Sequence, residues 1–335
     1  MKKIVVFGAT GTVGAYLCDS FRKNEKYQII AVGSRKSDNG FFKQIGIEYI
    51  SVNITQKEEF VKLPNEVYAI VHLAGMLPAR MKGYNPQSYI DINITGTLNI
   101  LEYAEKVKVN RIIYSQSISD IIHLCGSKDP IPADSNTSFP INNDHSIYSI
   151  SKNTAVDMIR HYAVKNNFKY YILRFPNIYL YHPDTHYYVD GVKKWQNYRL
   201  MIDKAIKGET LEIWGDPKIV RDIVYVKDCI QIIEKTIECE SAESGTYNVG
   251  TGIGVTMEEQ VKGIVQVFSS HNNKSSEIIY KPEKPNSIEY IFDISKNIEQ
   301  LNYHPEYSYI EYLEDMKKEM ELNRFALLWG YPENY

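Results

Sequence analysis

The chain has 335 residues, of which 44% are hydrophobic and 24% are charged. This composition excludes a disordered or fibrous protein, and the length allows a large α/β domain with a smaller second one. The formal net charge of -3 and a pI near 6.3 provide no basic surface for DNA or RNA, so no nucleic-acid partner is expected.

Short β-rich apolar runs alternate with longer amphipathic segments from the first residues onward. The runs predicted as buried strands are Lys3 to Phe7, Ile29 to Val32, Ala69 to Leu73, Arg111 to Tyr114 and Tyr170 to Arg174. The segments predicted as helices are Gly14 to Lys23, Ile94 to Lys106 and Tyr148 to Lys165. This alternation predicts a doubly wound parallel sheet, the Rossmann arrangement, with ligands at the carboxyl ends of its strands.

The pattern changes after Asn177. Residues 178–198 are rich in Tyr and His and show no steady period, which favours a loop-built substrate region over a sheet. The elements expected next are a helix near Arg199 to Lys207, a strand at Leu211 to Trp214 and a strand-helix pair from Ile223 to Ile237. We therefore expect a Rossmann domain of residues 1–177 and 222–250, and a smaller, discontinuous α/β substrate domain of residues 178–221 and 251–335.

Targeting and metal motifs are absent from the sequence. The apolar run Ile4 to Phe7 is too short for a signal peptide, and no stretch approaches the roughly 20 apolar residues of a membrane span. No zinc or disulfide motif is formed by the four widely separated cysteines, Cys18, Cys125, Cys229 and Cys239. A cytoplasmic protein without a membrane partner is expected. His182 and His186 flank a proline, which argues against a metal site.

A glycine-rich turn, Gly8-Ala9-Thr10-Gly11-Thr12-Val13-Gly14, follows the first predicted strand and opens a helix. Glycine adopts dihedrals that other residues avoid, and it lets the backbone approach a pyrophosphate. The helix N-terminus adds N–H donors and a favourable dipole. An ordinary tight turn is the alternative, but the position at the first βα junction favours a dinucleotide site. The residues expected to contact the cofactor are Gly8, Thr10, Gly11, Thr12, Val13 and Gly14.

The residues after the second strand should distinguish NAD from NADP. An acidic residue there would accept hydrogen bonds from the adenosine ribose of NAD. This chain instead has Ser34 and Arg35, which suit a 2′-phosphate, so NADP is favoured over NAD. The alternative is a solvated basic loop. Asn53, after the strand-like Tyr49 to Val52, is a candidate contact for the adenine edge.

Tyr148 and Lys152 are spaced by one helical turn, which puts both side chains on one helix face. A free phenol titrates near pH 10. An ammonium within about 4 to 6 Å, together with a positive nicotinamide, lowers that pKa and makes Tyr148 a usable general base. Ser117 would hydrogen-bond and orient the reacting oxygen. The other Tyr-x-x-x-Lys spacing, Tyr280 to Lys284, contains a proline that disfavours a helix.

These residues together resemble the extended short-chain dehydrogenase/reductase family, in particular its nucleotide-sugar epimerases and 4-keto-sugar reductases. The resemblance covers nearly the whole chain. It includes the motifs Val71-His72-Leu73-Ala74-Gly75, Asn93-Ile94-Thr95-Gly96-Thr97-Leu98-Asn99, Arg174-Phe175-Pro176-Asn177-Ile178-Tyr179, Arg221-Asp222-Ile223-Val224-Tyr225-Val226-Lys227-Asp228 and Tyr247-Asn248-Val249-Gly250.

The resemblance implies roles for individual residues. Lys152 would also hold the nicotinamide ribose, and Asn93 would support the active-site water and lysine network. Asn177 and Arg221 would hold the diphosphate of a nucleotide sugar, and the guanidinium of Arg221 suits it through forked, charge-assisted hydrogen bonds. For Arg221 the alternative is an ion pair with Asp222. The residues expected along the cofactor's path are Leu73, Ala74, Gly75 and Pro176.

The resemblance also implies a homodimer formed by the helices 94–106 and 148–165. Ile100, Val156 and Ile159 are candidate contacts, and packing on the sheet is their alternative. The chain departs from the 4,6-dehydratases of the family, which carry an Asp-Glu pair after the active-site hydroxyl. Ile118 and Ser119 stand there in this chain, so dehydration is disfavoured.

The activity implied is that of an NAD(P)-dependent oxidoreductase or isomerase at carbon 4 of a nucleotide-linked sugar. Tyr148 would take the hydroxyl proton while hydride leaves carbon 4, giving a 4-keto sugar. Return of the hydride to the other face is epimerisation, whereas a keto sugar that arrives from outside makes the enzyme an NADPH-dependent reductase. A non-catalytic NADP-sensing regulator on the same fold is a further alternative.

Overall fold

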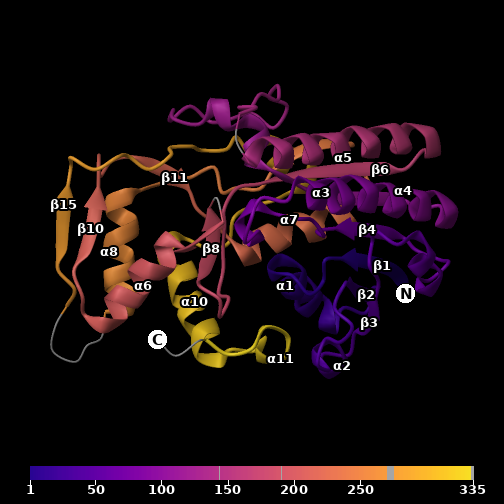
Figure 1. Ribbon diagram of the computed structural model, residues 1–335, viewed down its shortest axis with the longest axis horizontal. Helices are drawn as coiled ribbons and strands as arrows, with labels where there is room; N and C mark the ends of the chain where they lie inside the picture. Colours follow the sequence, from indigo (N-terminus) through magenta and orange to yellow (C-terminus); the bar gives the residue numbers. More distant parts are fainter. Residues whose placement is uncertain (143, 190, 270–274, 333–335) are drawn as a thin grey trace.

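Parallel strands form the centre of the molecule. The computed structural model describes residues 1–142, 144–189, 191–269 and 275–332. It contains a seven-stranded sheet in the order β13-β6-β5-β4-β1-β2-β3, and every neighbouring pair is parallel. The strands are β1 (Lys2–Phe7), β2 (Tyr27–Gly33), β3 (Glu48–Ser51), β4 (Ala69–His72), β5 (Arg111–Ser117), β6 (Lys169–Phe175) and β13 (Gly245–Asn248). The predicted doubly wound sheet is confirmed (Figure 1).

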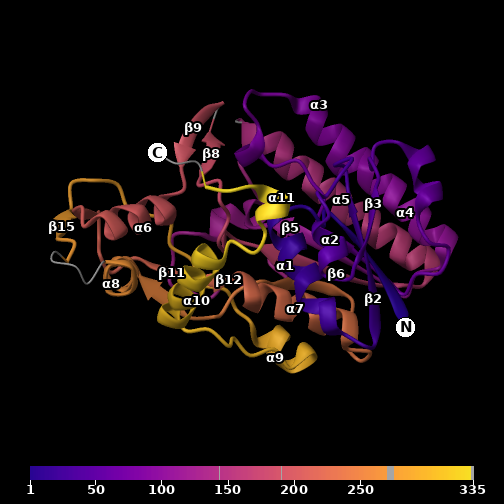
Figure 2. The ribbon, with the colours of Figure 1, turned by 90° about the horizontal axis from the view of Figure 1, so that it is seen from below.

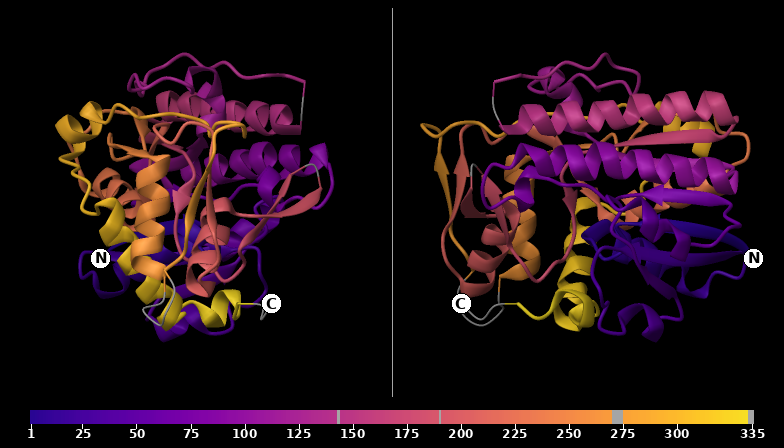
Figure 3. Two further views of the ribbon diagram at one scale, coloured as in Figure 1. Left: turned by 90° about the vertical axis from the view of Figure 1, so that its left-hand side faces the viewer. Right: turned by 45° about the vertical axis from the view of Figure 1, so that its right-hand side comes forward.

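Apolar residues of the strands alternate between the two faces of this sheet. In β1, Val5 and Phe7 are fully buried in the cluster that also contains residues of α4 (Gly96–Val107) and α5 (Asp144–Asn166). Ile4 and Val6 are buried in the cluster with residues of α1 (Thr12–Ser20) and α7 (Val226–Glu238). Helices therefore cover both faces, and the right-hand view of Figure 3 shows α4 and α5 side by side on one of them.

The predicted strands and helices of the first part are all present, with their ends shifted by a few residues. β5 runs on to Ser117, which places the predicted hydroxyl residue at the carboxyl end of a central strand. α4 is preceded by the short helix α3 (Pro86–Tyr89) and a π-helical segment, Ile90–Thr95, which carries Asn93. Such π-helical turns occur often at functional sites. A four-residue helix, α2 (Phe41–Gln44), follows β2.

Among its described residues, the second part of the chain contributes four two-stranded sheets. They are β7 (Ile178–Tyr179) with β12 (Val224–Tyr225), β8 (His186–Val189) with β9 (Val192–Trp195), β10 (Leu211–Trp214) with β15 (Ile278–Lys281), and β11 (Val220–Asp222) with β14 (Gly254–Thr256). The expectation of a loop across residues 178–198 is therefore wrong, because β8 and β9 form an antiparallel hairpin. Its Tyr, Val and Trp residues suit a strand although no clear alternation marks it.

The remaining helices are α6 (Asn197–Lys207), α8 (Met257–Phe268), α9 (Ser295–Leu301), α10 (Tyr309–Leu322) and α11 (Ala326–Trp329). The division into two domains stays a prediction, and two elements of its second part pack on the first. Asn297 of α9 donates to the backbone oxygen of Asn248 in β13, and Trp329 of α11 donates to that of Thr10. Figure 2 shows α11 beside α1 and α2.

The three residues proposed for a dimer contact are buried within this chain. Ile100, Val156 and Ile159 have exposed fractions of 1%, 5% and 0% and belong to the core between α4, α5 and the sheet. Their assignment to a dimer interface is therefore wrong, and the alternative of packing on the sheet is confirmed. The homodimer itself stays a prediction. No helix in the described ranges is long and apolar enough to span a bilayer.

Candidate active site

A cleft of about 950 Å³ lies at the carboxyl ends of the central strands. It includes the carboxyl ends of β1 and β4, where the strand order reverses and where open α/β sheets bind ligands. Of the predicted site residues, all except Asn93 and Arg221 line it. The lining residues predicted from sequence are Gly8, Thr10, Gly11, Thr12, Val13, Gly14, Ser34, Arg35, Asn53, Leu73, Ala74, Gly75, Ser117, Tyr148, Lys152, Pro176 and Asn177.

The glycine-rich turn is shaped by two close approaches. Gly8 has a φ of +86°, and a Cβ atom on it would lie 2.6 Å from the backbone nitrogen of Ala74. A Cβ atom on Gly14 would collide with the carbonyl oxygen of Gly8. Gly11 caps α1 without a side-chain hydrogen bond, so the first-turn N–H groups are not covered by a capping side chain. The turn therefore fits a pyrophosphate, which needs a bare backbone and a helix N-terminus.

The residues predicted to contact the adenosine, Arg35 and Asn53, form hydrogen bonds within the protein. The Arg35 guanidinium donates to the backbone oxygen of Leu328 at 2.5 Å, and the backbone oxygen of Arg35 accepts from the Tyr49 hydroxyl at 2.6 Å. Asn53 Oδ1 accepts from the N–H and the hydroxyl of Thr55 at 3.1 and 3.0 Å. Arg35 and Asn53 therefore serve the protein's own structure as well as lining the cleft.

Asn93 lies behind the wall of the cleft. It is 1% exposed, and its Oδ1 accepts from the backbone N–H of Met76 at 2.7 Å. Its Nδ2 donates to the backbone oxygen of Met76 at 3.2 Å and to Ser151 Oγ at 3.0 Å. Asn93 thus links the loop after β4 to α5. This position suits a supporting residue better than a direct contact.

Ser117, Tyr148 and Lys152 meet at one wall. The Ser117 side chain lies close enough to the Tyr148 hydroxyl to lower its pKa, and its Oγ accepts from the backbone N–H of Ser119 at 3.2 Å. The Lys152 ammonium donates to the backbone oxygen of Ser115 and lies 4.0 Å from the centre of the Tyr114 ring. The strand end of β5 and the first turns of α5 therefore bring together the three predicted catalytic groups, with the lysine turned toward β5.

Burial dominates the electrostatics of this wall. It raises the pKa of Tyr148 to about 12; the hydrogen bond with Ser117 opposes this shift, and the charge of Asp120 adds to it. Burial also lowers the pKa of Lys152 to about 7. The expectation that the ammonium of Lys152 lowers the phenol pKa is therefore not met by the protein's own groups. The groups that shift this pKa are Ser117 and Asp120, not Lys152.

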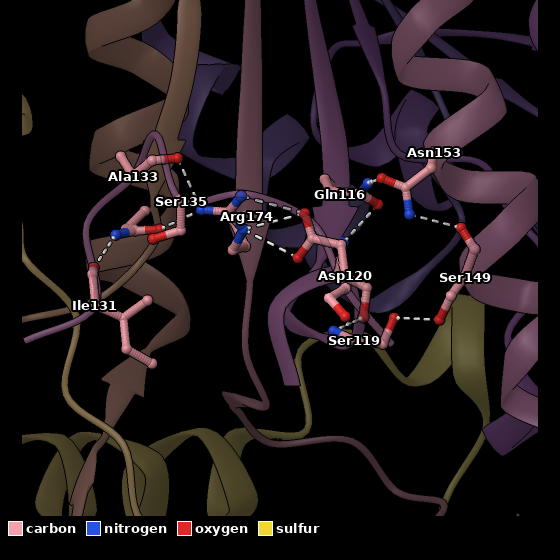
Figure 4. A network of polar contacts seen from close by, with 12 residues as sticks. Gln116, Ser119, Asp120, Ile131, Ala133, Ser135, Ser149, Asn153 and Arg174 are labelled. Atoms are coloured by element: carbon pink, nitrogen blue, oxygen red, sulfur yellow. Dashed lines mark hydrogen bonds and ion pairs between the residues drawn. The ribbon is translucent and has the colours of Figure 1, made fainter. Parts of the chain in front are cut away.

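A chain of polar contacts fixes the segment after β5 against α5 (Figure 4). Gln116 Oε1 accepts from the backbone N–H of Ser117 at 2.9 Å, and its Nε2 donates to Asn153 Oδ1 at 3.3 Å. Asn153 Nδ2 donates to the backbone oxygen of Ser149 at 2.8 Å, and Ser149 Oγ donates to Ser119 Oγ at 3.1 Å. Sequence reasoning missed Gln116 and Asn153, although each adjoins a predicted catalytic residue.

Asp120 is committed to a buried ion pair (Figure 4). Its carboxylate accepts from Arg174 Nε at 3.0 Å, and both side chains are 3% exposed. The Arg174 guanidinium also donates to the backbone oxygen of Ala133 at 2.9 Å and to Asn248 Oδ1 at 3.1 Å. A carboxylate held in this way is poorly placed to exchange protons with a substrate, which agrees with the argument against dehydration.

The two predicted diphosphate residues meet at one phenol. Asn177 lines the cleft, whereas Arg221 lies outside its lining and donates from Nε to the backbone oxygen of Ile288 at 2.8 Å. Burial raises the pKa of the Tyr179 hydroxyl, and the neighbouring side chains of Arg221 and Asn177 oppose this shift. Arg221 therefore has a protein-based position beside the cleft.

The alternative of an Arg221–Asp222 ion pair is wrong. Asp222 is fully buried and its carboxylate accepts hydrogen bonds from two other segments of the chain. The donors are the N–H and hydroxyl of Thr251 at 2.8 and 2.7 Å, the N–H of Gly252 at 3.0 Å and the N–H of Phe292 at 3.2 Å. Asp222 therefore ties three backbone segments together and leaves Arg221 free to face elsewhere.

Sequence reasoning did not place several other residues in the cleft, which come from distant parts of the chain. Arg80 pairs with Asp184 at 3.2 Å across the cleft, and the rings of His182 and Trp329 lie 4.6 Å apart. Burial lowers the pKa of His182 to about 4. His186 packs instead against Trp195. Within the described residues, no group of three or more His, Cys, Asp or Glu side chains is placed to hold a metal ion.

Comparisons with known proteins agree with this geometry. The model of the NAD dependent epimerase/dehydratase family matches residues 4–250. A putative UDP-glucose 4-epimerase of Methanocaldococcus jannaschii is 26% identical over 304 residues, which cover 90% of this chain and 93% of that protein. The UDP-glucose 4-epimerase of Thermotoga maritima, solved with UDP-glucose, has a TM-score of 0.72 at 23% identity, covering 95% of this chain and 99% of that one. A UDP-glucuronic acid 4-epimerase variant of Bacillus cereus, solved with UDP-4-deoxy-4-fluoro-glucuronic acid and NAD, has a TM-score of 0.74 at 22% identity with the same coverage.

Proposed function

Because this chain belongs to the NAD-dependent epimerase/dehydratase family and is an enzyme of its extended short-chain dehydrogenase/reductase type, we propose that it inverts carbon 4 of a nucleotide-linked sugar. One observation carries the proposal. The hydroxyls of Ser117 and Tyr148 share a cleft with the glycine turn, and Lys152 lies at the same wall. A sugar hydroxyl beside these groups would have a proton acceptor next to a dinucleotide.

The residues divide the work of the reaction. A nicotinamide cofactor held by the glycine turn and Lys152 would supply the redox chemistry, the reversible removal of a hydride from carbon 4 of the sugar. Ser117 orients the reacting oxygen, and Tyr148 takes its proton and later gives it back. Burial opposes ionisation of this phenol. Positive charge would have to offset it, from the oxidised nicotinamide and from Lys152 once contacts with the cofactor keep Lys152 protonated.

We propose NAD as the resident cofactor. The prediction of NADP from Ser34 and Arg35 has no support from the neighbours, and the Bacillus cereus structure contains NAD. The Arg35 guanidinium also has a partner in the protein, the backbone oxygen of Leu328. A cation that is already hydrogen-bonded is less available to a 2′-phosphate.

The direct test of the function uses the purified protein without added cofactor. We expect UDP-sugars such as UDP-glucose or UDP-glucuronic acid to be converted to their carbon-4 epimers, followed by proton NMR, and mass spectrometry to find NAD retained by the protein. Consumption of NADPH with a 4-keto sugar and no epimer would establish the reductase instead. Binding of cofactor without turnover of any of these substrates would favour the regulator.

Cofactor binding should be linked to protonation of Lys152. Its pKa in the free protein is about 7, so at pH 8 most of these side chains are neutral. Ribose hydroxyls that accept hydrogen bonds from the ammonium would raise this pKa, so binding takes up a proton. We expect NADH affinity to fall between pH 7 and pH 9 by up to about tenfold per unit. Fluorescence titration of NADH at several pH values measures this slope.

The control for this linkage is Lys152→Met, which removes the titrating group and should flatten the pH dependence while weakening binding. NADH is used because its nicotinamide is uncharged, so ionisation of Tyr148 adds little to the slope. An equal slope in Lys152→Met and in the wild type would assign the proton to another group.

A further inference from the structure

The residues after α10 leave the second part of the chain and return to the sheet. We define residues 323–332 as the C-terminal arm. Asn323 ends α10 in a left-handed conformation, and its Oδ1 accepts from the Tyr181 hydroxyl at 3.2 Å. Phe325 is fully buried, with its ring 4.5 Å from that of Tyr16 in α1 and 5.4 Å from that of Phe41 in α2. The arm is therefore packed on the domain that carries the glycine turn (Figure 2).

Polar contacts hold the arm before and after the buried Phe325. Arg324 pairs with Asp19 of α1 and, at 2.6 Å, with Glu319 of α10. The backbone oxygens of Leu328 and Leu327 accept from Arg35 at 2.5 Å and from Asn39 at 2.9 Å. These donors belong to the loop after β2, at the adenosine end of the cleft. The arm is thus hydrogen-bonded to the part of the protein where an adenosine ribose is expected.

Trp329 extends from the arm into the cleft. Its indole N–H donates to the backbone oxygen of Thr10, in the glycine turn, at 3.1 Å. Its ring lies 4.6 Å from the ring of His182, and both side chains line the cleft. Thr10 and His182 belong to the sheet domain and to the segment after β7, so Trp329 bridges the two sides. The bridge lies beside the backbone expected to hold the pyrophosphate.

We propose that the C-terminal arm is part of the dinucleotide site, and that Trp329 is a positioning residue that, with His182, closes the cleft beside the glycine turn and retains the cofactor between turnovers. The inference rests on the proposed function, because it takes the cofactor to be a dinucleotide. An epimerase recovers its oxidised cofactor in every cycle and has no need to release it. A reductase must exchange it each time. Closure by the arm therefore suits the epimerase.

The test measures how fast the cofactor leaves. Protein loaded with NADH is mixed with a large excess of NAD, and the loss of bound NADH fluorescence gives the dissociation rate without any sugar present. We expect Trp329→Ala to release NADH at least about tenfold faster, which corresponds to about 1.4 kcal/mol. Trp329→Phe keeps a ring beside His182 but loses the hydrogen bond to Thr10. Its rate of NADH release should lie between those of the wild type and Trp329→Ala.

The control is Leu322→Ala, because Leu322 is an apolar residue that directly precedes the arm, has an exposed fraction of 70% and lies outside the lining of the cleft. Its release rate should equal that of the wild type. Circular dichroism checks that each variant is folded, and Trp329→Phe keeps the test informative if Trp329→Ala does not fold. If folded Trp329→Ala or Trp329→Phe binds NADH and releases it at the wild-type rate, the role of the arm is overturned and the proposed function is not. A wild-type protein that binds no NADH would overturn the proposed function as well.

Discussion

Replacing Tyr148 by Phe is expected to lower the rate of carbon-4 inversion by about 10²- to 10⁴-fold, the range of a lost general acid-base group. The substitution keeps the ring, which packs 5.9 Å from that of Tyr89, so the fold should be preserved. It removes the hydroxyl that lies beside Ser117 in the cleft. The measurement is kcat by NMR at saturating substrate, with NADH binding followed separately and expected to persist.

Tyr162→Phe is a suitable control for this experiment, because Tyr162 lies on the same helix and outside the lining of the cleft. It should leave kcat unchanged. A Tyr148→Phe protein with wild-type turnover would show that another group moves the proton.

Replacing Asp120 by Ala is expected to reduce the free energy of unfolding by about 3–5 kcal/mol, the usual effect of leaving one half of a buried ion pair alone. The Arg174 guanidinium would keep its hydrogen bonds to Ala133 and Asn248 but lose its counter-charge in a site where it is 3% exposed. Urea denaturation followed by circular dichroism gives this free energy.

The control is the exposed pair of Asp157 and Arg160 in α5, whose side chains are 76% and 51% exposed. Asp157→Ala should change the free energy of unfolding by no more than about 1 kcal/mol, since water screens such pairs. If Asp120→Ala lost as little as Asp157→Ala, the buried pair would not be a main support of the segment after β5.

Local sequence patterns were sufficient to predict the central sheet and its glycine turn. Alternating apolar runs and amphipathic segments predicted the parallel sheet, because burial on both faces leaves a plain mark in a strand. The glycine turn was readable since its backbone excludes side chains at Gly8 and Gly14. The spacing of Tyr148 and Lys152 likewise predicted a shared helix face.

Features that depend on burial or on distant partners were not readable. The apolar side of a helix looks the same whether it meets a sheet or a second subunit, so Ile100 was misassigned. The spacing of Tyr148 and Lys152 carries no information on desolvation, which dominates both pKa values. The β8–β9 hairpin and the pair of Asp120 with Arg174 depend on topology rather than on neighbours in sequence.

The bond from Trp329 to Thr10 joins residues 319 positions apart. Residues 11–328 must therefore be synthesised between the two partners of this contact. Contacts of such long range form late, because a large loop has to close before they stabilise the fold. During synthesis this wall of the cleft would therefore be completed only after α11 has emerged, and a bulky group attached to α11 would disturb the glycine turn.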